Sequence, residues 1–217
     1  MKQLSYLIFL LGLIIIGWEY PILYPLKLLV VFFHESSHAI ATLLTGGTVK
    51  ELVINQDQGG YVISQGGNRF IILSAGYIGS LLWGVVIYMA SVKSHYDKAI
   101  MAVLGISILI ITLVLSRSIF SWLFGLLSGG AMLLMARYLA EKYNDFVLRL
   151  IGLTSIMYAP LDIYSDTISR SYLQSDAYLL AEYTGGTTLL WGSIWIIISI
   201  VVIFYCLKWV LNKPLIE

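Results

Sequence analysis

Long apolar stretches, interrupted only briefly by polar residues, run along the whole sequence. A helix that crosses a lipid bilayer needs about 20 mostly apolar residues. Stretches close to that length predict spanning helices over residues 4–20, 25–45, 70–91, 99–115, 119–139, 146–169 and 188–211. We therefore expect an all-α, multi-pass integral membrane protein with six or seven transmembrane helices.

One segment departs from this helical pattern. Gly46 and Gly47 end the second apolar stretch, and residues 48–55, TVKELVIN, then have the composition of a β-strand. The turn sequence DQGG at 57–60 leads into a second short run, YVIS, at 61–64. The sequence thus predicts a small β-hairpin directly after the second helix.

The composition agrees with a membrane protein and excludes several other classes. Hydrophobic residues make up 59% of the chain and charged residues 12%, against about 45–50% and about 25% in soluble proteins. A net charge of +1 gives no basic footprint for nucleic acid, so the expected surroundings are the lipid bilayer. The single cysteine, Cys206, rules out a cysteine-based zinc cluster. We find no repeat, linker or soluble domain and treat residues 1–217 as one polytopic domain, for which the sequence defines neither membrane orientation nor oligomeric state.

The chemistry is concentrated at residues 34–38, which read His-Glu-Ser-Ser-His inside the second apolar stretch. Residues four apart lie on one face of an α-helix, so His34 and His38 can bind one zinc ion together. Glu35 is then placed to act as a general base toward the attacking water, as in zinc metallopeptidases. His95, the third histidine, lies in a short loop and is expected to be solvated rather than to bind metal.

The position of this motif inside the membrane strengthens the interpretation. Ionisable side chains in a bilayer are costly and usually mark a function or a buried partner. Three of them within one helical turn need a strong partner, and a divalent metal ion supplies one. The alternative is a purely structural cluster in which these side chains only form hydrogen bonds within the bundle.

A catalytic zinc site also needs a third protein ligand. Asp162 and Asp166, at the end of the sixth apolar stretch, share one face of a helix. Pro160 predicts a kink just before Asp162 and favours that residue over Asp166. Glu182 is a rival ligand within residues 170–187, where we expect an interfacial loop with a short helix. In another alternative, the two aspartates only mark the membrane interface.

These motifs resemble the site-2 protease family of intramembrane zinc metallopeptidases. The resemblance rests on FFHESSHAIATLLTGG at 32–47, the β-rich segment that follows, SAGYIGSLLWG at 74–84 and APLDIYSD at 159–166. The order of these elements agrees with the family over residues 25–169. By this resemblance, Asp162 takes the role of the family's third zinc ligand.

The chain also departs from the family pattern. The family's third-ligand motif contains an asparagine, which helps to stabilise the oxyanion, and a glycine after the aspartate. Here the asparagine is missing and Ile163 replaces the glycine. Asn68 is a candidate polar substitute. No PDZ domain interrupts the chain, which resembles the compact branch of the family that lacks one.

The motif and the resemblance together predict an intramembrane zinc metallopeptidase that hydrolyses peptide bonds in or near transmembrane segments of membrane proteins. The expected zinc ligands are His34, His38 and Asp162, and the expected catalytic base is Glu35. The hairpin edge at Val49–Ile54 is expected to hold an extended substrate through main-chain hydrogen bonds; the alternative is a hairpin that only plugs the cavity.

A competing hypothesis is a non-proteolytic zinc-binding membrane protein, such as a transporter or an inactive peptidase relative. Such a protein has no chemical need for a general base. The presence of Glu35 therefore argues against it.

Overall fold

The computed structural model of the chain describes residues 2–18, 20–170 and 173–212. Helices make up most of this part, with one pair of strands. The elements follow in the order α1 (Lys2–Gly17), η1 (Pro21–Leu23), α2 (Tyr24–Leu44), β1 (Thr48–Ile54), β2 (Gly60–Gln65), α3 (Arg69–Lys93), α4 (Asp97–Leu115), α5 (Ile119–Tyr138), α6 (Glu141–Tyr164), η2 (Ser165–Ser169), α7 (Asp176–Thr184) and α8 (Thr188–Leu211).

The described residues contain five helices that are long and apolar enough to cross a membrane: α3, α4, α5, α6 continued by η2, and α8. The first two apolar stretches form a sixth candidate as a pair of helices bent by 113°. Pro21 and Pro25 lie at this bend, where proline cannot supply the amide that continues a helix. The predictions of a multi-pass membrane protein and of its hairpin are confirmed. The upper count of seven spans counted the two members of the bent pair separately.

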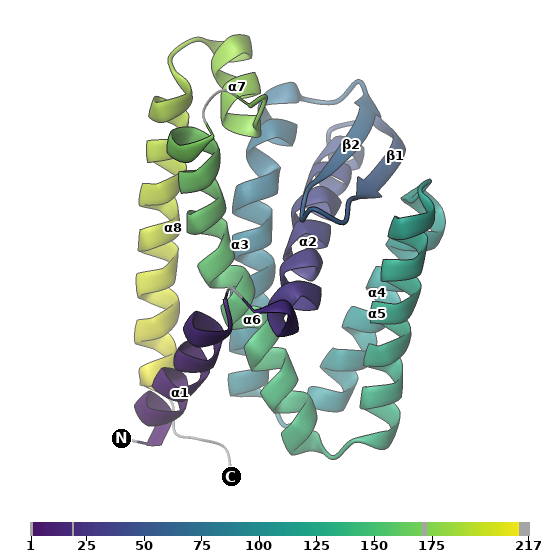
Figure 1. Cartoon of the computed structure of the whole chain (residues 1–217), viewed down its shortest axis with the longest axis vertical. Coiled ribbons are helices and arrows are strands. Elements are labelled where there is room, and N and C mark those ends of the chain that lie inside the picture. The colour runs from purple at the N-terminus through teal and green to yellow at the C-terminus, as the bar shows by residue number, and fades with distance from the viewer. Residues whose placement is uncertain (1, 19, 171–172, 213–217) are drawn as a thin grey trace.

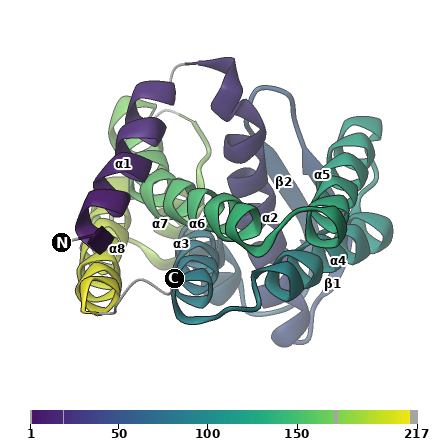
Figure 2. The same cartoon turned by 90° about the horizontal axis from the view of Figure 1, so that it is seen from below.

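Helix α6 lies in the middle of the bundle. Seen from below, it has α1 and α8 on one side and α4 and α5 on the other (Figure 2). It packs closely against α3, because a β-carbon at Gly84 would lie only 2.8 Å from the carbonyl oxygen of Gly152. Small residues at such crossings let membrane helices approach each other closely. This contact fixes the position of α6, and of the aspartates at its end, relative to α3.

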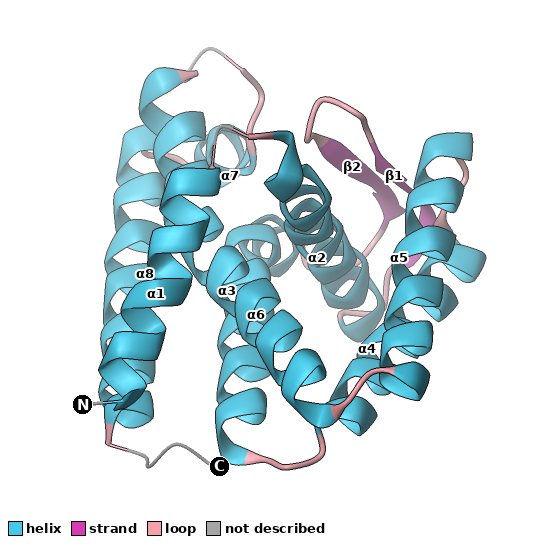
Figure 3. Cartoon of the chain, turned by 60° about the horizontal axis from the view of Figure 1, so that its bottom comes forward, coloured by secondary structure: helices cyan, strands magenta, loops and turns pink. Residues whose placement is uncertain are grey.

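The hairpin lies at the end of the bundle opposite the start of α1 and the end of α8, and α7 lies at the same end as the hairpin (Figure 1). Its strands are antiparallel, with Leu52 opposite Val62 and Ile54 opposite Gly60. Leu52 and Ile54 are buried in the same core as Phe32 of α2. Figure 3 shows the hairpin between α2 and α5.

The outer edge of β1 is covered by the turn between α4 and α5. Leu52 forms a β-bridge with Ser116. The amide of Ile54 donates to Ser121 Oγ at 2.7 Å, and Ser121 Oγ donates back to the Ile54 carbonyl at 3.3 Å. The main-chain groups on this side of the hairpin are therefore used within the fold.

The segment after α6 carries most of the polar residues of this end of the molecule. Helix α6 continues through Pro160 and widens into the π-helix η2. Helix α7 then begins at Asp176, after Ser175, whose side chain accepts a hydrogen bond from the Tyr178 amide and caps the helix. The short helix predicted between residues 170 and 187 is thus confirmed.

Candidate metal centre

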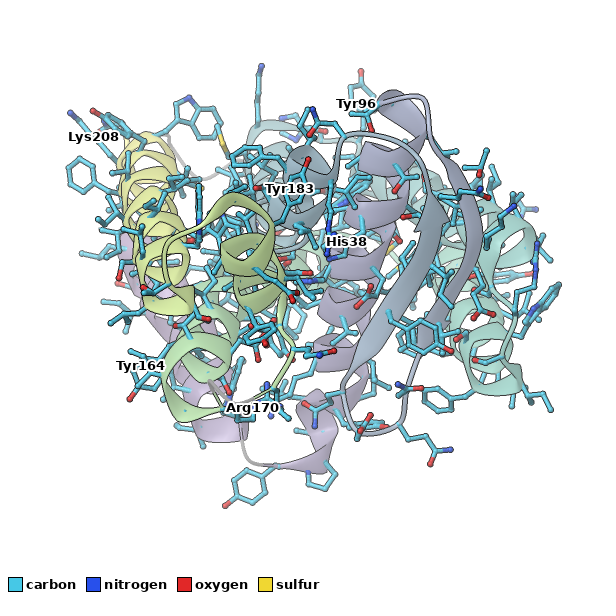
Figure 4. The ribbon with its side chains drawn as sticks, turned by 90° about the horizontal axis from the view of Figure 1, so that it is seen from above. His38, Tyr96, Tyr164, Arg170, Tyr183 and Lys208 are labelled. Carbon is cyan, nitrogen blue, oxygen red and sulfur yellow. The ribbon has the colours of Figure 1, made fainter. Side chains whose placement is uncertain are left out.

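The two histidines of the motif lie one helical turn apart on α2 and face a cavity of about 680 Å³. Their rings are 4.8 Å apart between centroids. Seen from above, His38 lies between α7 and the hairpin (Figure 4). The local helix geometry is sufficient to bring both imidazoles to one place, as the i, i+4 spacing predicts.

Asp176, the first residue of α7, closes the group. Its Oδ2 atom lies 2.9 Å from His34 Nε2 and 3.0 Å from His38 Nε2. Among the described residues, these three offer ligand atoms that all lie within 4.8 Å of one another. Two imidazole nitrogens and a carboxylate oxygen form a donor set that suits zinc. The three side chains therefore fit a metal ion.

The electrostatic environment keeps Asp176 ionised. Burial would raise the pKa of this carboxyl, but nearby His38 and the hydrogen bonds with both histidines outweigh burial. Its pKa therefore lies well below the usual range for aspartate.

The remaining nitrogen of each imidazole faces an oxygen atom. His38 Nδ1 lies 2.7 Å from the main-chain carbonyl oxygen of Ile72, which can only accept a hydrogen bond. Nδ1 of His38 therefore carries a proton, and Nε2 is the nitrogen directed at Asp176. On His34, Nδ1 lies 4.0 Å from Asp162 Oδ2.

Helix α3 passes directly behind the metal-facing nitrogens. A β-carbon at Gly76 would overlap Nε2 of both His34 and His38. Only glycine leaves room at this position for both rings and for an ion between them. This close approach is a second observation that favours a metal centre at this point of the fold.

Glu35 lies in the same cavity as the histidines and is buried, with 6% of its surface exposed. Its side chain rests against the first residue of β2: a β-carbon at Gly60 would lie 2.8 Å from Glu35 Oε1. The carboxyl group therefore lies between the metal group and the hairpin. This is where a general base must lie if substrate enters along β2.

Asp166 has partners of its own. The Tyr77 hydroxyl donates to Asp166 Oδ2 at 2.6 Å, and Arg170 Nη2 donates to Oδ1 at 2.9 Å. The ring of Tyr77 also packs edge-on against His34, with centroids 5.0 Å apart. Asp166 thus links α3 to the end of α6, and it is not one of the three residues that could hold the metal.

Comparison with known proteins agrees with this geometry. A sequence model of the Peptidase M50B-like family matches residues 7–206. The chain belongs to this family. The match includes the motif helix, the hairpin and Asp176, and it confirms the resemblance to site-2 proteases. The chain matches no curated protein and no solved structure.

Within this M50B-like chain, the structure brings His34, Glu35 and His38 together as the motif predicts. Asp162 also lines the cavity, but it faces the nitrogen of His34 that points away from Asp176. Its role as third ligand stays a prediction, and the geometry offers Asp176 for that role. The sequence analysis did not name Asp176 as a candidate ligand. The signal that could have found it is its charge within a polar stretch of a chain that is otherwise mostly apolar.

Three other polar residues lie outside the metal group. Glu182, the rival ligand, is exposed on α7. The Asn68 side chain accepts a hydrogen bond from the Ile71 amide and caps α3, so it already has a structural use. His95 is exposed in the turn between α3 and α4, where the sequence predicts a solvated histidine.

The expectation that Val49–Ile54 offers a free edge to the substrate is wrong, because Ser116 and Ser121 cover that edge. Within the described part of the chain, β2 pairs only with β1, so its outer edge is the free one. In an antiparallel pair, main-chain groups that are not used between the two strands point outward on both strands. Ile54 shows this outward orientation, so its partner Gly60 has it as well.

Proposed function

We propose that this protein is an intramembrane zinc metallopeptidase that hydrolyses peptide bonds in or near transmembrane segments of membrane proteins. The observation that carries the proposal is the convergence of His34, His38 and Asp176 beside the buried Glu35. Membership of the M50B-like peptidase family supports the same chemistry.

The proposed ligands are the two imidazole Nε2 atoms and the carboxylate of Asp176. A zinc ion bound there supplies a Lewis acid that polarises the peptide carbonyl and makes water a nucleophile at neutral pH. Two helical histidines and one carboxylate leave a position open for substrate, as catalytic zinc sites require.

The proton transfers are assigned to Glu35. It takes a proton from water as the water oxygen adds to the carbonyl carbon, and it returns that proton to the departing amine as the carbon–nitrogen bond breaks. Burial against Gly60 and next to the histidines keeps this carboxyl within the same enclosed cavity.

The proposed substrate-binding element is the free edge of β2. A transmembrane helix hides its amides in its own hydrogen bonds, so a segment must become extended before it can be cleaved. Gly60 and Val62 both line the cavity, and an extended segment paired with β2 would lie alongside Glu35. The described part of the chain forms a sheet of two strands, which leaves the outer side of β2 for such pairing.

The test uses the purified protein in lipid vesicles. The substrate is a second membrane protein from the same cells. Glu35→Gln keeps the shape of the side chain but cannot take the proton, so cleavage should fall roughly 10²–10⁴-fold. The variant should keep the metal content of the unchanged protein, because Glu35 is not a ligand. Glu51→Gln, at a strand position outside the cavity, is the matched control and should cleave normally.

Three results would count against the proposal. Loss of metal in Glu35→Gln would make Glu35 a ligand. Cleavage that persists in Glu35→Gln would remove its role as the base. Metal binding without any cleavage by the unchanged protein would favour a non-proteolytic zinc protein instead.

A further inference from the structure

In each of the two histidines, Nδ1 is the ring nitrogen that does not face Asp176, and it lies near another oxygen atom. A histidine that binds metal through one nitrogen carries its proton on the other, and the acceptor of that proton fixes the orientation of the ring. For His38 the acceptor is the Ile72 carbonyl at 2.7 Å. A main-chain carbonyl inside a helix is a rigid acceptor, so the orientation of His38 is set by α3.

The second nitrogen of His34 faces a carboxylate instead. Its Nδ1 atom faces Asp162 Oδ2 at 4.0 Å, while its Nε2 atom faces Asp176 at 2.9 Å. The two nitrogens of an imidazole point in divergent directions. A carboxylate on the Nδ1 side therefore cannot share an ion with Nε2 unless the ring turns over.

The 4.0 Å separation is within the range of an ion pair and can be closed by one bridging water or a small rotation of the side chain. Asp162 is largely enclosed, with 20% of its side chain exposed. Asp166, one turn further along, already accepts hydrogen bonds from Tyr77 and Arg170. Of the two aspartates, Asp162 is thus the one directed at His34.

We propose that Asp162 is a positioning residue that holds the proton of His34 Nδ1, while Asp176 from α7 is the ligand. The aspartate that matches the family's ligand motif would then act one step away from the metal, through His34. This inference rests on the metal site of the proposed function, and its measurement does not require cleavage.

Asp162, at the end of α6, and Asp166, in η2, thus have different roles. A carboxylate that accepts from a ligand histidine fixes its tautomer and makes its metal-facing nitrogen more basic. In the proposed arrangement Asp162 fixes the tautomer of His34, and the Ile72 carbonyl fixes that of His38. Asp166 instead joins α3 to α6 through Tyr77.

The experiment measures zinc affinity by competition with a chelator for the purified full-length protein and four variants. Asp162→Ala should weaken zinc binding roughly 10–100-fold, as the loss of a carboxylate behind a ligand histidine does. Asp162→Asn should weaken it less, because the amide oxygen still accepts from Nδ1. Asp176→Ala should lose far more affinity than either. Glu182→Gln, at an exposed position of α7 outside the cavity, is the control and should stay close to the unchanged protein.

A second measurement separates a ligand from a positioning residue. With cobalt in place of zinc, the visible spectrum reports the number and geometry of ligands. Both Asp162 variants should keep the spectrum of the unchanged protein at saturating cobalt, whereas Asp176→Ala should alter it. Asp162→Asn has nearly the same size and shape as the original residue, so it keeps the test valid if Asp162→Ala does not fold.

The outcomes separate the two proposals. An altered cobalt spectrum in Asp162→Asn, together with an unaltered spectrum in Asp176→Ala, would make Asp162 the ligand and overturn the inference. Unchanged zinc affinity in both Asp162 variants would also overturn it. If the unchanged protein does not cleave but the zinc affinities keep the predicted order, only the proposed peptidase activity is contradicted.

Discussion

Gly76 shows how tightly individual residues define the candidate centre. The two histidines come from α2, but the space between their metal-facing nitrogens is bounded by the backbone of α3 at Gly76. No side chain larger than hydrogen fits there without moving an imidazole. The geometry of the centre thus depends on a residue that offers no ligand atom.

Gly76→Ala should abolish zinc binding while the protein remains folded. The added methyl group overlaps both Nε2 atoms, although alanine in a helix normally favours folding by about 0.5–1 kcal/mol over glycine. Zinc content and the melting temperature of the same sample check this prediction. Gly130→Ala on α5 is the matched control, because its added β-carbon meets nothing within 4 Å. Full zinc content in Gly76→Ala would contradict the placement of the metal between the two rings.

At this scale the sequence predicts local relationships well and distant ones poorly. His34, Glu35 and His38 lie within five residues, so helix periodicity alone places them together. Asp176 lies 142 residues after His34 in the chain. Its sequence context, after a serine cap in the first turn of α7, is equally that of an acidic residue that stabilises a helix terminus. The packing of α7 against α3 and α8 brings it to the histidines.

Among the elements, the hairpin has two edges with different uses. The β1 edge is tied to the turn between α4 and α5, so the hairpin is anchored on that side. The β2 edge lines the cavity beside Glu35. This asymmetry leaves the β2 edge, beside Glu35, as the one open to the extended substrate that we propose.

Val62→Pro should weaken substrate binding and leave the hairpin intact. Val62 is opposite Leu52, whose bridge to Ser116 shows that main-chain groups at this pair point outward. Proline removes only an outward amide there, and losing a hydrogen bond of about 1 kcal/mol should raise KM roughly fivefold. Val62→Ala keeps the amide and serves as the control. Equal KM values for the two variants would show that substrate does not pair with β2.

The elements themselves follow closely from sequence patterns. The hairpin was predictable because a β-rich run, a Gly-Gly turn and a second short run follow one another, and a short helix was predictable in the polar stretch before α8. The covered edge of β1 was not predictable, since Ser116 and Ser121 lie more than sixty residues away in the chain. The rotation of α6, which directs Asp162 toward one side of His34, likewise depends on its packing against α3 at Gly84 and Gly152.

Over the whole molecule, the bundle encloses a polar centre at one end of an otherwise apolar structure. The candidate spans carry few charged residues. The ionisable groups of the cavity come from α2, the hairpin, α3, the end of α6 with η2, and α7. Grouping such side chains inside a membrane protein is costly unless a bound ion and a function compensate for it. The five spans that are single helices were predictable from apolar length, but the joining of α1 and α2 into one bent pair needed the structure.

Measurement of the cleavage rate against zinc content tests whether this protein is a metal-dependent peptidase. The protein is stripped of metal with a chelator, placed in lipid vesicles with a membrane-protein substrate, and supplied with zinc in steps. We expect no cleavage in the metal-free protein and a rate that rises to a plateau at about one zinc per chain, because the three-ligand site holds one ion. Full cleavage by the metal-free protein, or none at full zinc occupancy, would contradict the account.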